Sequence, residues 1–271
     1  MLAEGNAVVT GASRGIGRAV ALELAVRGFD VIATMRNPDD GATLTEEADA
    51  LPGSLRLERL DVTVPRSIRI PDTLRVLVNN AGTEAEHPPF EATSLDLWRR
   101  MFDTNVFGVI EVSRRAIPAL RAAGGGVLCN VTSSSILAPV PFYAPYRSSK
   151  AAVSAMGESL RAELAPLGIR VLEIMPGPID TDMLSGSDRA PEAIEHDGYR
   201  ATAERYYERR RGIEGQVTSA EDAARAIVDA VLDDGSPLRV ACDPLAAGLL
   251  DAWRASSDED LMQAMLPMWT G

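Results

Sequence analysis

The feature that most constrains this chain is a regular alternation of short apolar runs with longer stretches of helical pattern. The runs are rich in Val, Leu and Ile, the composition that buried parallel strands prefer. Alternating strands and helices predict a parallel sheet with helices on both faces. We therefore predict an α/β fold with a doubly wound parallel sheet of about seven strands, in one domain over residues 1–271. The predicted strands are Ala7–Thr10, Val31–Thr34, Leu55–Leu60, Val76–Asn79, Val127–Val131, Val171–Met175 and Leu238–Cys242, and the predicted helices are Gly15–Gly28, Leu44–Leu51, Leu95–Ala123, Ala144–Leu167 and Ser219–Asp233.

The charge balance of the chain excludes some partners. The net charge is −12 and the pI is about 4.7, so the surface should repel nucleic acid and anionic membranes. We see no signal peptide and no apolar run of the roughly 18–20 residues that a membrane span needs, so we expect a cytoplasmic protein. Cys129 and Cys242 lie in apolar runs without CxxC spacing and are expected to be buried, reduced thiols.

A glycine-rich segment, TGASRGIG at residues 10–17, follows the first predicted strand and opens a helix. Gly11 permits a tight turn, Gly15 lets the backbone approach a pyrophosphate, and Gly17 allows the helix to pack closely on the strand. The helix N-terminus supplies amide donors and a positive dipole end to phosphates. The position of the segment predicts a dinucleotide site.

The residues around the second strand indicate which dinucleotide is bound. An acidic residue usually ends this strand where NAD is preferred, because it binds the ribose hydroxyls. Here Met35 takes that place, and Arg36 follows it. Together with Arg14 in the glycine turn, Arg36 favours a 2′-phosphate, hence NADP(H), with NAD(H) possible. The alternative is that Arg36 is a solvated turn residue, and the nearby Asp39 and Asp40 weaken the positive field.

Two further strand ends carry small or polar residues. Asp61-Val62 ends the third strand, where the carboxylate can bind an adenine edge or cap the next turn. Asn79-Asn80-Ala81-Gly82 ends the fourth, where small and amide residues let the chain pass close to a cofactor and tie neighbouring strands together. Between them, Pro65 and Pro71 leave room for about one helical turn.

A tyrosine and a lysine four residues apart, Tyr146 and Lys150, share one helix face. A phenol is a poor acid or base at neutral pH unless a nearby cation stabilises its phenolate, and Lys150 can be that cation. Ser133 can hold a carbonyl oxygen beside the phenol. With a dinucleotide that carries hydride, this arrangement predicts interconversion of a carbonyl and an alcohol.

The chain resembles the short-chain dehydrogenase/reductase family. The resemblance rests on TGASRGIG, Asn79–Gly82, Asn105, Asn130–Ser133, Tyr146-x-x-x-Lys150 and Pro176-Gly177-Pro178, in the family's order and spacing over about residues 5–182. It implies an NAD(P)-binding Rossmann fold and an active site of Asn105, Ser133, Tyr146 and Lys150. It also implies a homodimer or homotetramer, built partly from the long helices before and after the catalytic serine.

The resemblance implies a role for each site residue. Tyr146 is the acid in reduction and the base in oxidation, Lys150 lowers the tyrosine pKa and holds the nicotinamide ribose, Ser133 holds the substrate oxygen, and Asn105 anchors a water. Pro176-Gly177 and Thr181 flank the nicotinamide, with Ile179 near its carboxamide. The cofactor-binding residues are expected to be Gly11, Ser13, Arg14, Gly15, Ile16, Gly17, Arg36, Asp61, Val62, Asn79, Ala81, Gly82, Tyr146, Lys150, Pro176, Gly177, Ile179 and Thr181.

Other residues compete for the catalytic roles. Tyr143 also has a basic residue four later, Arg147, but its offset from Ser133 is wrong and arginine cannot exchange a proton. Ser134 and Ser135 compete with Ser133, although counting back from Tyr146 favours Ser133. We expect Tyr143, Ser134 and Ser135 to line the substrate pocket.

The pocket is expected to be apolar and to take a hydrophobic carbonyl or alcohol of small to medium size. Its predicted lining adds Ile136, Leu137, Val140, Phe142, Met183 and the segment Glu84–Phe90. Residues 183–217 form a long polar insertion that holds Tyr199, Tyr206 and Tyr207 among arginines. Two interpretations of this insertion stay open: it is an aromatic lid over the substrate, or it is a solvated charged helix. Residues 244–271 are predicted to form a helical tail that packs on the body or on a partner subunit.

No metal is expected, because His87 and His196 are isolated in the sequence. Two other functions stay open. An acyl-thioester reductase needs a basic mouth for its carrier, which Arg205 and Arg209–Arg211 could form. A non-catalytic NADP(H)-sensing protein would have no need for all of Asn105, Ser133, Tyr146 and Lys150.

Overall fold

The computed structural model describes residues 1–84, 87–186, 190–212 and 216–270. Its seven strands are all parallel and form one sheet in the order β3-β2-β1-β4-β5-β6-β7. The strand order reverses between β1 and β4, which is where ligands of doubly wound sheets bind. The predicted fold class and every predicted strand are confirmed. The strands are β1 Asn6–Thr10, β2 Asp30–Met35, β3 Ser54–Arg59, β4 Val76–Asn79, β5 Gly126–Val131, β6 Ile169–Met175 and β7 Arg239–Ala241.

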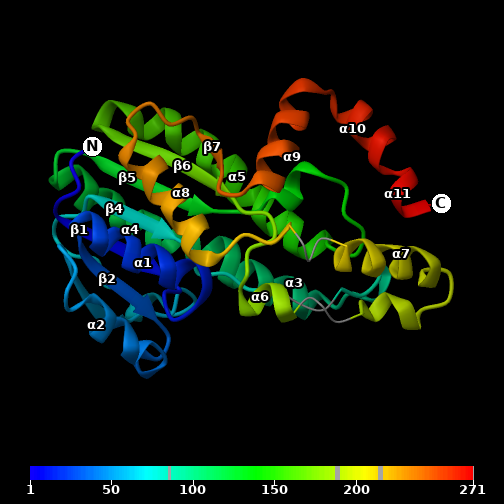
Figure 1. Cartoon of the computed structure of the whole chain (residues 1–271), viewed down its shortest axis with the longest axis horizontal. Helices are drawn as coiled ribbons and strands as arrows, with labels where there is room; N and C mark the ends of the chain where they lie inside the picture. Colours follow the sequence, from blue (N-terminus) through cyan, green and yellow to red (C-terminus); the bar gives the residue numbers. More distant parts are fainter. Residues whose placement is uncertain (85–86, 187–189, 213–215, 271) are drawn as a thin grey trace.

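Helices cover both faces of this sheet (Figure 1). Each face has its own apolar core, built from strand residues that alternate between the two sides. On one face lie α1 Gly15–Arg27, α2 Ala42–Ala48 and α8 Ala220–Leu232; on the other lie α3 Leu95–Phe102, α4 Val109–Ala122 and α5 Ala144–Leu164.

The long helix predicted over Leu95–Ala123 contains an irregularity. A π-helical segment, Asp103–Gly108, joins α3 to α4, and it holds Asn105. Such bulges frequently occur at functional sites. The crossover after β3 holds only the short 3₁₀ helix Pro65–Ser67, as its prolines predict.

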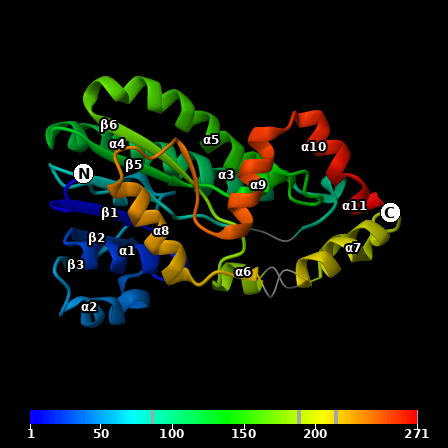
Figure 2. The same ribbon diagram turned by 45° about the horizontal axis from the view of Figure 1, so that its top comes forward.

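The predicted insertion and tail both contain helices. The insertion includes α6 Asp182–Gly186, a 3₁₀ helix at Glu192–Glu195 and α7 Arg200–Arg211, and the tail forms α9 Pro244–Ala255, α10 Asp258–Met265 and α11 Pro267–Thr270. Figures 1 and 2 show α7 and α11 side by side, at the end of the molecule remote from the N-terminus. Helix α9 packs Leu250 on the body, whereas Met262 on α10 is exposed.

Cys129 and Cys242 are free and buried, as predicted, and burial raises the pKa of each thiol to about 12. Within the described ranges, no helix has the length and apolar character needed to cross a membrane.

Candidate active site

The glycine turn has the conformation that the sequence predicts. Gly11 and Gly15 have φ of 65° and 56°, in the left-handed region that favours glycine. A Cβ on Gly17 would lie 2.2 Å from Asn80 Nδ2 and 2.4 Å from the Gly11 carbonyl oxygen, so α1 packs too closely for any side chain there. No described side chain caps α1 at its N-terminus. Its first amide groups therefore form a donor set that fits a dinucleotide phosphate.

Thr10 and Asn80 connect the ends of the adjacent strands β1 and β4. Thr10 Oγ1 accepts hydrogen bonds from the backbone N–H groups of Asn80 and Ala81, both at 3.0 Å. Asn80 Nδ2 donates to the carbonyl oxygens of Thr10 and Gly11, also at 3.0 Å. These residues fix the turn on which the cofactor cradle depends. Neither was among the predicted site residues, although both belong to motifs that the sequence displays.

Two predicted cofactor residues use their side chains differently. Asn79 is buried, and its Nδ2 donates to Ser113 Oγ and Asn130 Oδ1, both at 2.9 Å. Its side chain therefore ties β4 to β5 and α4, as expected of residues 79–82, while its part in cofactor binding stays a prediction. The Asp61 carboxylate accepts from the backbone N–H and the hydroxyl of Thr63, at 2.9 and 2.7 Å. Asp61 therefore caps the turn that follows β3, which is one of the two alternatives that the sequence left open.

The arginines expected at the adenosine end are both exposed. Arg14 Nη1 lies 3.2 Å from Asp182 Oδ2, an ion pair that joins the glycine turn to α6. Arg36 directly follows β2 and lies on the surface. Both residues stand at the carboxyl ends of strands, on the side of the sheet where the cradle lies.

Ser133, Tyr146 and Lys150 come together at the ends of β5 and α5. Lys150 is buried, its Nζ donates to the Val131 carbonyl oxygen at 2.9 Å, and it lies 5.8 Å from the centre of the Tyr146 ring. Ser133 lies near enough to the Tyr146 hydroxyl to lower the pKa of that phenol. The structure thus assembles the predicted phenol, hydroxyl and ammonium from two elements.

Asn105 borders the same cluster from the π-helical segment. Its Oδ1 accepts from the Thr83 N–H at 2.8 Å, and its Nδ2 donates to the Thr83 carbonyl oxygen at 2.9 Å and to Ser149 Oγ at 3.0 Å. A Cβ on Gly82 would lie 3.4 Å from both Asn105 Oδ1 and Lys150 Nζ, so both groups face this glycine.

Burial and nearby charges shift the pKa values of Lys150 and Tyr146. Burial lowers the pKa of Lys150 to about 8, with a smaller upward effect from the charge of Glu84. Burial, and then the charge of Glu84, raises the pKa of Tyr146, while Ser133 and the charge of Arg210 lower it. The expected lowering of the tyrosine pKa by Lys150 is therefore not found. The protein's own groups hold Tyr146 in its protonated form.

The segment after β6 lies against the glycine turn. A Cβ on Gly15 would be 3.0 Å from Thr181 Cγ2, and Ile179 is buried. The Gly177 N–H donates to Asp243 Oδ2 at 2.6 Å, and Asp243 Oδ1 accepts from the N–H of Ala246, so one carboxylate fixes both this segment and the start of α9. Sequence reasoning missed Asp243, because its partner in the segment is a backbone group far away in the sequence.

The residues predicted to line the substrate pocket lie in different surroundings. Met183 is exposed, and Ser134 is buried, with its N–H donating to the Pro176 carbonyl oxygen at 2.9 Å. Leu137 packs with Met175 and Leu250 against α9, so the expectation that it faces the substrate is wrong.

The structure also shows which contacts are made by Tyr143 and Arg147, the pair that competes with Tyr146 and Lys150 in the sequence. Arg147 Nε donates to the Ser135 carbonyl oxygen at 2.7 Å and Nη2 donates to that of Ile136 at 3.3 Å, which fixes the loop before α5. Arg147 is thus a structural residue, and Tyr143 makes its polar contacts with other groups.

His87 is not isolated, contrary to the expectation from the sequence. Its Nε2 lies 3.2 Å from Glu84 Oε1, and its ring stacks on Tyr143 with centroids 4.1 Å apart. From α7, Tyr206 contributes a hydroxyl 3.0 Å from that of Tyr143. The described residues contain no group of three or more His, Cys, Asp or Glu side chains that could hold a metal.

The arginines of α7 divide between two roles. Arg205 and Arg209 donate to the carbonyl oxygens of Trp269 and Met268, at 3.5 and 3.1 Å, and Arg209 also lies over the Trp269 ring. These contacts hold α11 and occupy two of the arginines that a basic mouth for an acyl carrier would use. Arg210 instead points toward Tyr143.

A phosphate-fitting glycine turn and a Ser–Tyr–Lys cluster at the carboxyl ends of one doubly wound sheet define an oxidoreductase that uses a nicotinamide dinucleotide. The model of the short chain dehydrogenase family matches residues 5–192. The chain belongs to the short-chain dehydrogenase/reductase family.

Known proteins resemble the chain over most of its length. An uncharacterized oxidoreductase, YusZ of Bacillus subtilis, is 42% identical over 190 residues, which is 67% of each chain. The 3beta-hydroxysteroid dehydrogenase 1 of Eggerthella lenta is 33% identical over 84% of this chain and 87% of its own. A short-chain dehydrogenase from Burkholderia cenocepacia, solved in complex with NADP, has a TM-score of 0.77 at 28% identity and covers 98% of this chain and 99% of its own.

Proposed function

We propose that this protein is an NADP(H)-preferring oxidoreductase that interconverts a ketone or aldehyde and an alcohol on a small-to-medium hydrophobic substrate. The observation that carries the proposal is the cluster around Tyr146, with Ser133 near its hydroxyl and Lys150 Nζ 5.8 Å from the centre of its ring. Support for the substrate class comes from the hydroxysteroid dehydrogenase of Eggerthella lenta, whose similarity covers the insertion as well as the core.

In this proposal each residue of the cluster has one task. Tyr146 gives its proton to the substrate oxygen during reduction and takes it back during oxidation, while Ser133 holds that oxygen. The Lys150 ammonium stabilises the phenolate that forms, and Asn105 fixes the turn at Thr83 beside it. The nicotinamide supplies or accepts the hydride when the dinucleotide is bound. The glycine turn, the backbone of residues 79–82 and residues 176–181 would hold it.

The preference for NADP(H) rests on Arg14 and Arg36. A 2′-phosphate binds best where guanidinium groups meet it, and β2 ends in Met35 rather than in an acidic residue. The NADP complex of the Burkholderia cenocepacia protein supports this preference.

The experiment compares Tyr146→Phe with the unchanged protein. NADPH and NADH consumption is followed with a panel of steroid, retinoid, quinone, aliphatic and acyl-thioester carbonyls. We expect kcat to fall by about 10²–10⁴-fold in Tyr146→Phe, because only the proton donor is lost. NADPH affinity, measured by fluorescence titration, should stay within about twofold. The matched control is Tyr207→Phe, on α7.

Each alternative function has its own outcome in this experiment. Turnover of acyl thioesters alone would favour the acyl-thioester reductase. Tight NADPH binding with no turnover of any carbonyl by the unchanged protein would favour the non-catalytic sensor. Equal turnover by Tyr146→Phe would remove the tyrosine mechanism.

A further inference from the structure

The polar contact between α7 and the start of the catalytic helix α5 centres on the hydroxyl group of Tyr143, beside ring contacts of Tyr206 with Phe142 and Tyr143. Arg210 Nη1 donates to this hydroxyl and to that of Tyr206, the second at 2.9 Å, and the two phenol oxygens are 3.0 Å apart. Tyr143 and Tyr206 are both buried. Two side chains of α7 therefore meet a single acceptor on the body of the protein.

Tyr143 is also linked to Glu84, after β4, because its ring stacks on His87, whose Nε2 lies 3.2 Å from Glu84 Oε1. Burial raises the pKa of the Glu84 carboxyl, but the nearby His87, Tyr143 and Arg210 outweigh burial and leave the pKa below its ordinary value. Glu84 is therefore a carboxylate. Arg210 meets the Tyr143 hydroxyl as a donor, because an arginine only donates. The Glu84 carboxylate meets Tyr143 through the stacked His87.

The Tyr143 ring connects these contacts to the catalytic tyrosine. One face of the ring stacks on His87, with centroids 4.1 Å apart and planes 11° apart. The Tyr146 ring meets it edge to face at 5.9 Å. A movement of Tyr143 would therefore disturb the packing of Tyr146, and the position of Tyr143 is set from α7 on one side and from Glu84 and His87 on the other.

We propose that Arg210, Tyr143 and Glu84 form a latch that holds α7 closed beside the proposed substrate site, so that Arg210 and Glu84 act as positioning residues for substrate binding. The inference rests on the proposed function of Tyr146. When α7 moves away, the guanidinium and the carboxylate lose a partly buried, charge-assisted arrangement. The latch therefore favours a closed α7, and a substrate held under it is shielded from water.

The first test is kinetic and uses the carbonyl of the panel that the unchanged protein reduces fastest. Arg210→Met, Tyr143→Phe and Glu84→Gln should each raise KM for this carbonyl by about tenfold, because each removes one charge-assisted link of the latch. We expect kcat to change by less than about threefold and KM for NADPH to be unaffected. Arg210→Lys should recover part of the loss, since the charge and a donor return.

A matched control and a double variant separate the latch from general damage. Arg211 is the next residue of α7, is exposed, and lies over the Tyr207 ring, so Arg211→Met should leave KM unchanged. If Glu84 and Arg210 both act through the position of Tyr143, the double variant Glu84→Gln/Arg210→Met should have about the KM of the worse single variant. Fully multiplicative losses would show that the two residues act separately and would overturn the latch.

A second test needs no activity. Amide hydrogen exchange of Arg200–Arg211 should become about tenfold faster in Tyr143→Phe and Glu84→Gln, while the strand amides keep their protection. Faster exchange in a protein that turns over no carbonyl would retain the latch and overturn the proposed function. Unchanged exchange would overturn the latch, whatever the activity. Tyr143→Phe removes a single oxygen, so it keeps the test valid if another variant fails to fold.

Discussion

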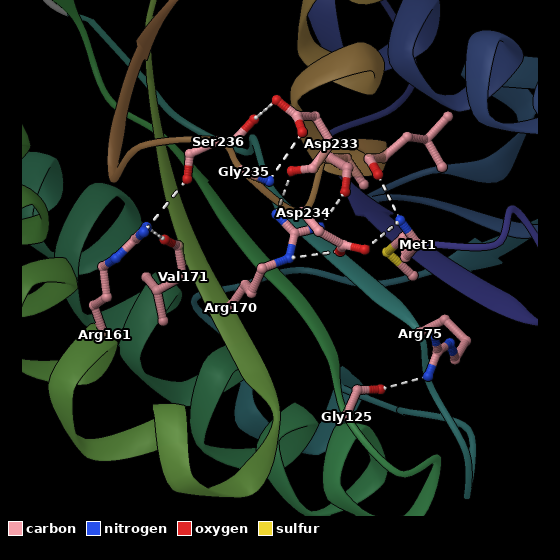
Figure 3. Close-up of polar contacts among 12 residues, drawn as sticks. Met1, Arg75, Gly125, Arg161, Arg170, Val171, Asp233, Asp234, Gly235 and Ser236 are labelled. Atoms are coloured by element: carbon pink, nitrogen blue, oxygen red, sulfur yellow. Dashed lines mark hydrogen bonds and ion pairs between the residues drawn. The ribbon is translucent and has the colours of Figure 1, made fainter.

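The two ends of the sheet use buried polar groups in different ways. At the amino ends of β4, β5, β6 and β7, arginines donate to backbone carbonyl oxygens (Figure 3). Arg170 donates to the carbonyl of Asp233 at 2.9 Å, Arg161 to those of Val171 and Ser236 at 2.8 and 3.3 Å, and Arg75 to that of Gly125 at 2.9 Å. At the carboxyl ends, Ser133, Tyr146 and Lys150 instead come together, and the charge of Glu84 raises the pKa of both Tyr146 and Lys150.

This difference separates structural from chemical use of polar residues. A guanidinium that satisfies loop carbonyls holds one backbone geometry, and it keeps its charge across the working pH range. A phenol, an ammonium and a carboxylate placed together in a buried site acquire shifted pKa values, which is typical of functional sites. Substitutions at the carboxyl ends should therefore change activity more than stability, and substitutions at the amino ends should do the reverse.

The largest effect is expected at Lys150. Lys150→Met should lower kcat by about 10²–10⁴-fold, because the cation that stabilises the phenolate is lost while the four-carbon stem is largely replaced. The melting temperature should change little, since removing a buried charge relieves its desolvation and offsets the loss of the donor to the Val131 carbonyl oxygen. A large loss of stability with normal turnover per folded molecule would contradict the contrast between the two ends.

The same residue predicts a pH dependence. With a pKa of about 8, Lys150 loses its proton as the pH rises through 8, so kcat/KM should fall above that pH. The folded pKa lies below the ordinary value of 10.5, so the unfolded chain binds more protons between these values. This group's contribution to stability therefore increases as the pH rises through that window. Lys150→Met should lack both dependences in rate profiles and thermal melts.

The ion pair of Glu173 and Arg239 lies between the two ends of the sheet. Its disruption should give the largest loss of stability among the variants. Glu173 is buried and accepts from Thr132 Oγ1 and Ser154 Oγ, and Arg239 Nε lies 3.1 Å from its carboxylate. Arg239→Met should lower the free energy of unfolding by about 3–5 kcal/mol, because the carboxylate is left buried and uncompensated.

A double variant checks this cause. Glu173→Gln/Arg239→Met removes both charges, so urea unfolding should show much of the stability restored. If the double variant is no more stable than Arg239→Met, the loss comes from the packing of Arg239 on the Trp253 ring, 5.0 Å away, rather than from charge.

At the amino ends, Arg170→Met should cost about 1–3 kcal/mol of stability, because the carbonyl oxygens of Asp233 and Val231 lose their donor. Turnover per folded molecule should stay within about twofold of the unchanged protein. Urea unfolding and steady-state kinetics on the same preparation check both statements. A tenfold fall in kcat with unchanged stability would contradict the statement that the amino ends of the sheet affect stability more than activity.

The fold and the central site could be predicted because their signals are local. Strand runs, the glycine turn and the four-residue spacing of Tyr146 and Lys150 follow from short-range sequence patterns. The structure accordingly has every predicted strand and brings Ser133, Tyr146 and Lys150 together.

The rest depends on contacts between distant segments. Glu84, His87 and Arg210 converge on Tyr143 from a loop and from α7, and no spacing in the sequence reports such a meeting. Leu137 has the apolar character of a pocket residue, yet α9 covers it. The raised pKa of Tyr146 likewise depends first on burial and then on the charge of the distant Glu84, and neither follows from the spacing of Tyr146 and Lys150.

The smallest effect is expected at Arg36, an exposed residue at the carboxyl end of β2. It tests whether a surface residue at this end of the sheet also affects activity more than stability. Arg36→Ala should raise KM for NADPH by about tenfold and leave KM for NADH unchanged, because only NADPH carries the 2′-phosphate that a guanidinium would bind. The thermal melt should not shift, since Arg36 is on the surface. The matched control is Arg59→Ala, at the end of β3, which should change neither KM. An equal rise in both KM values would assign Arg36 to holding the turn after β2, and would leave the preference for NADPH to Arg14.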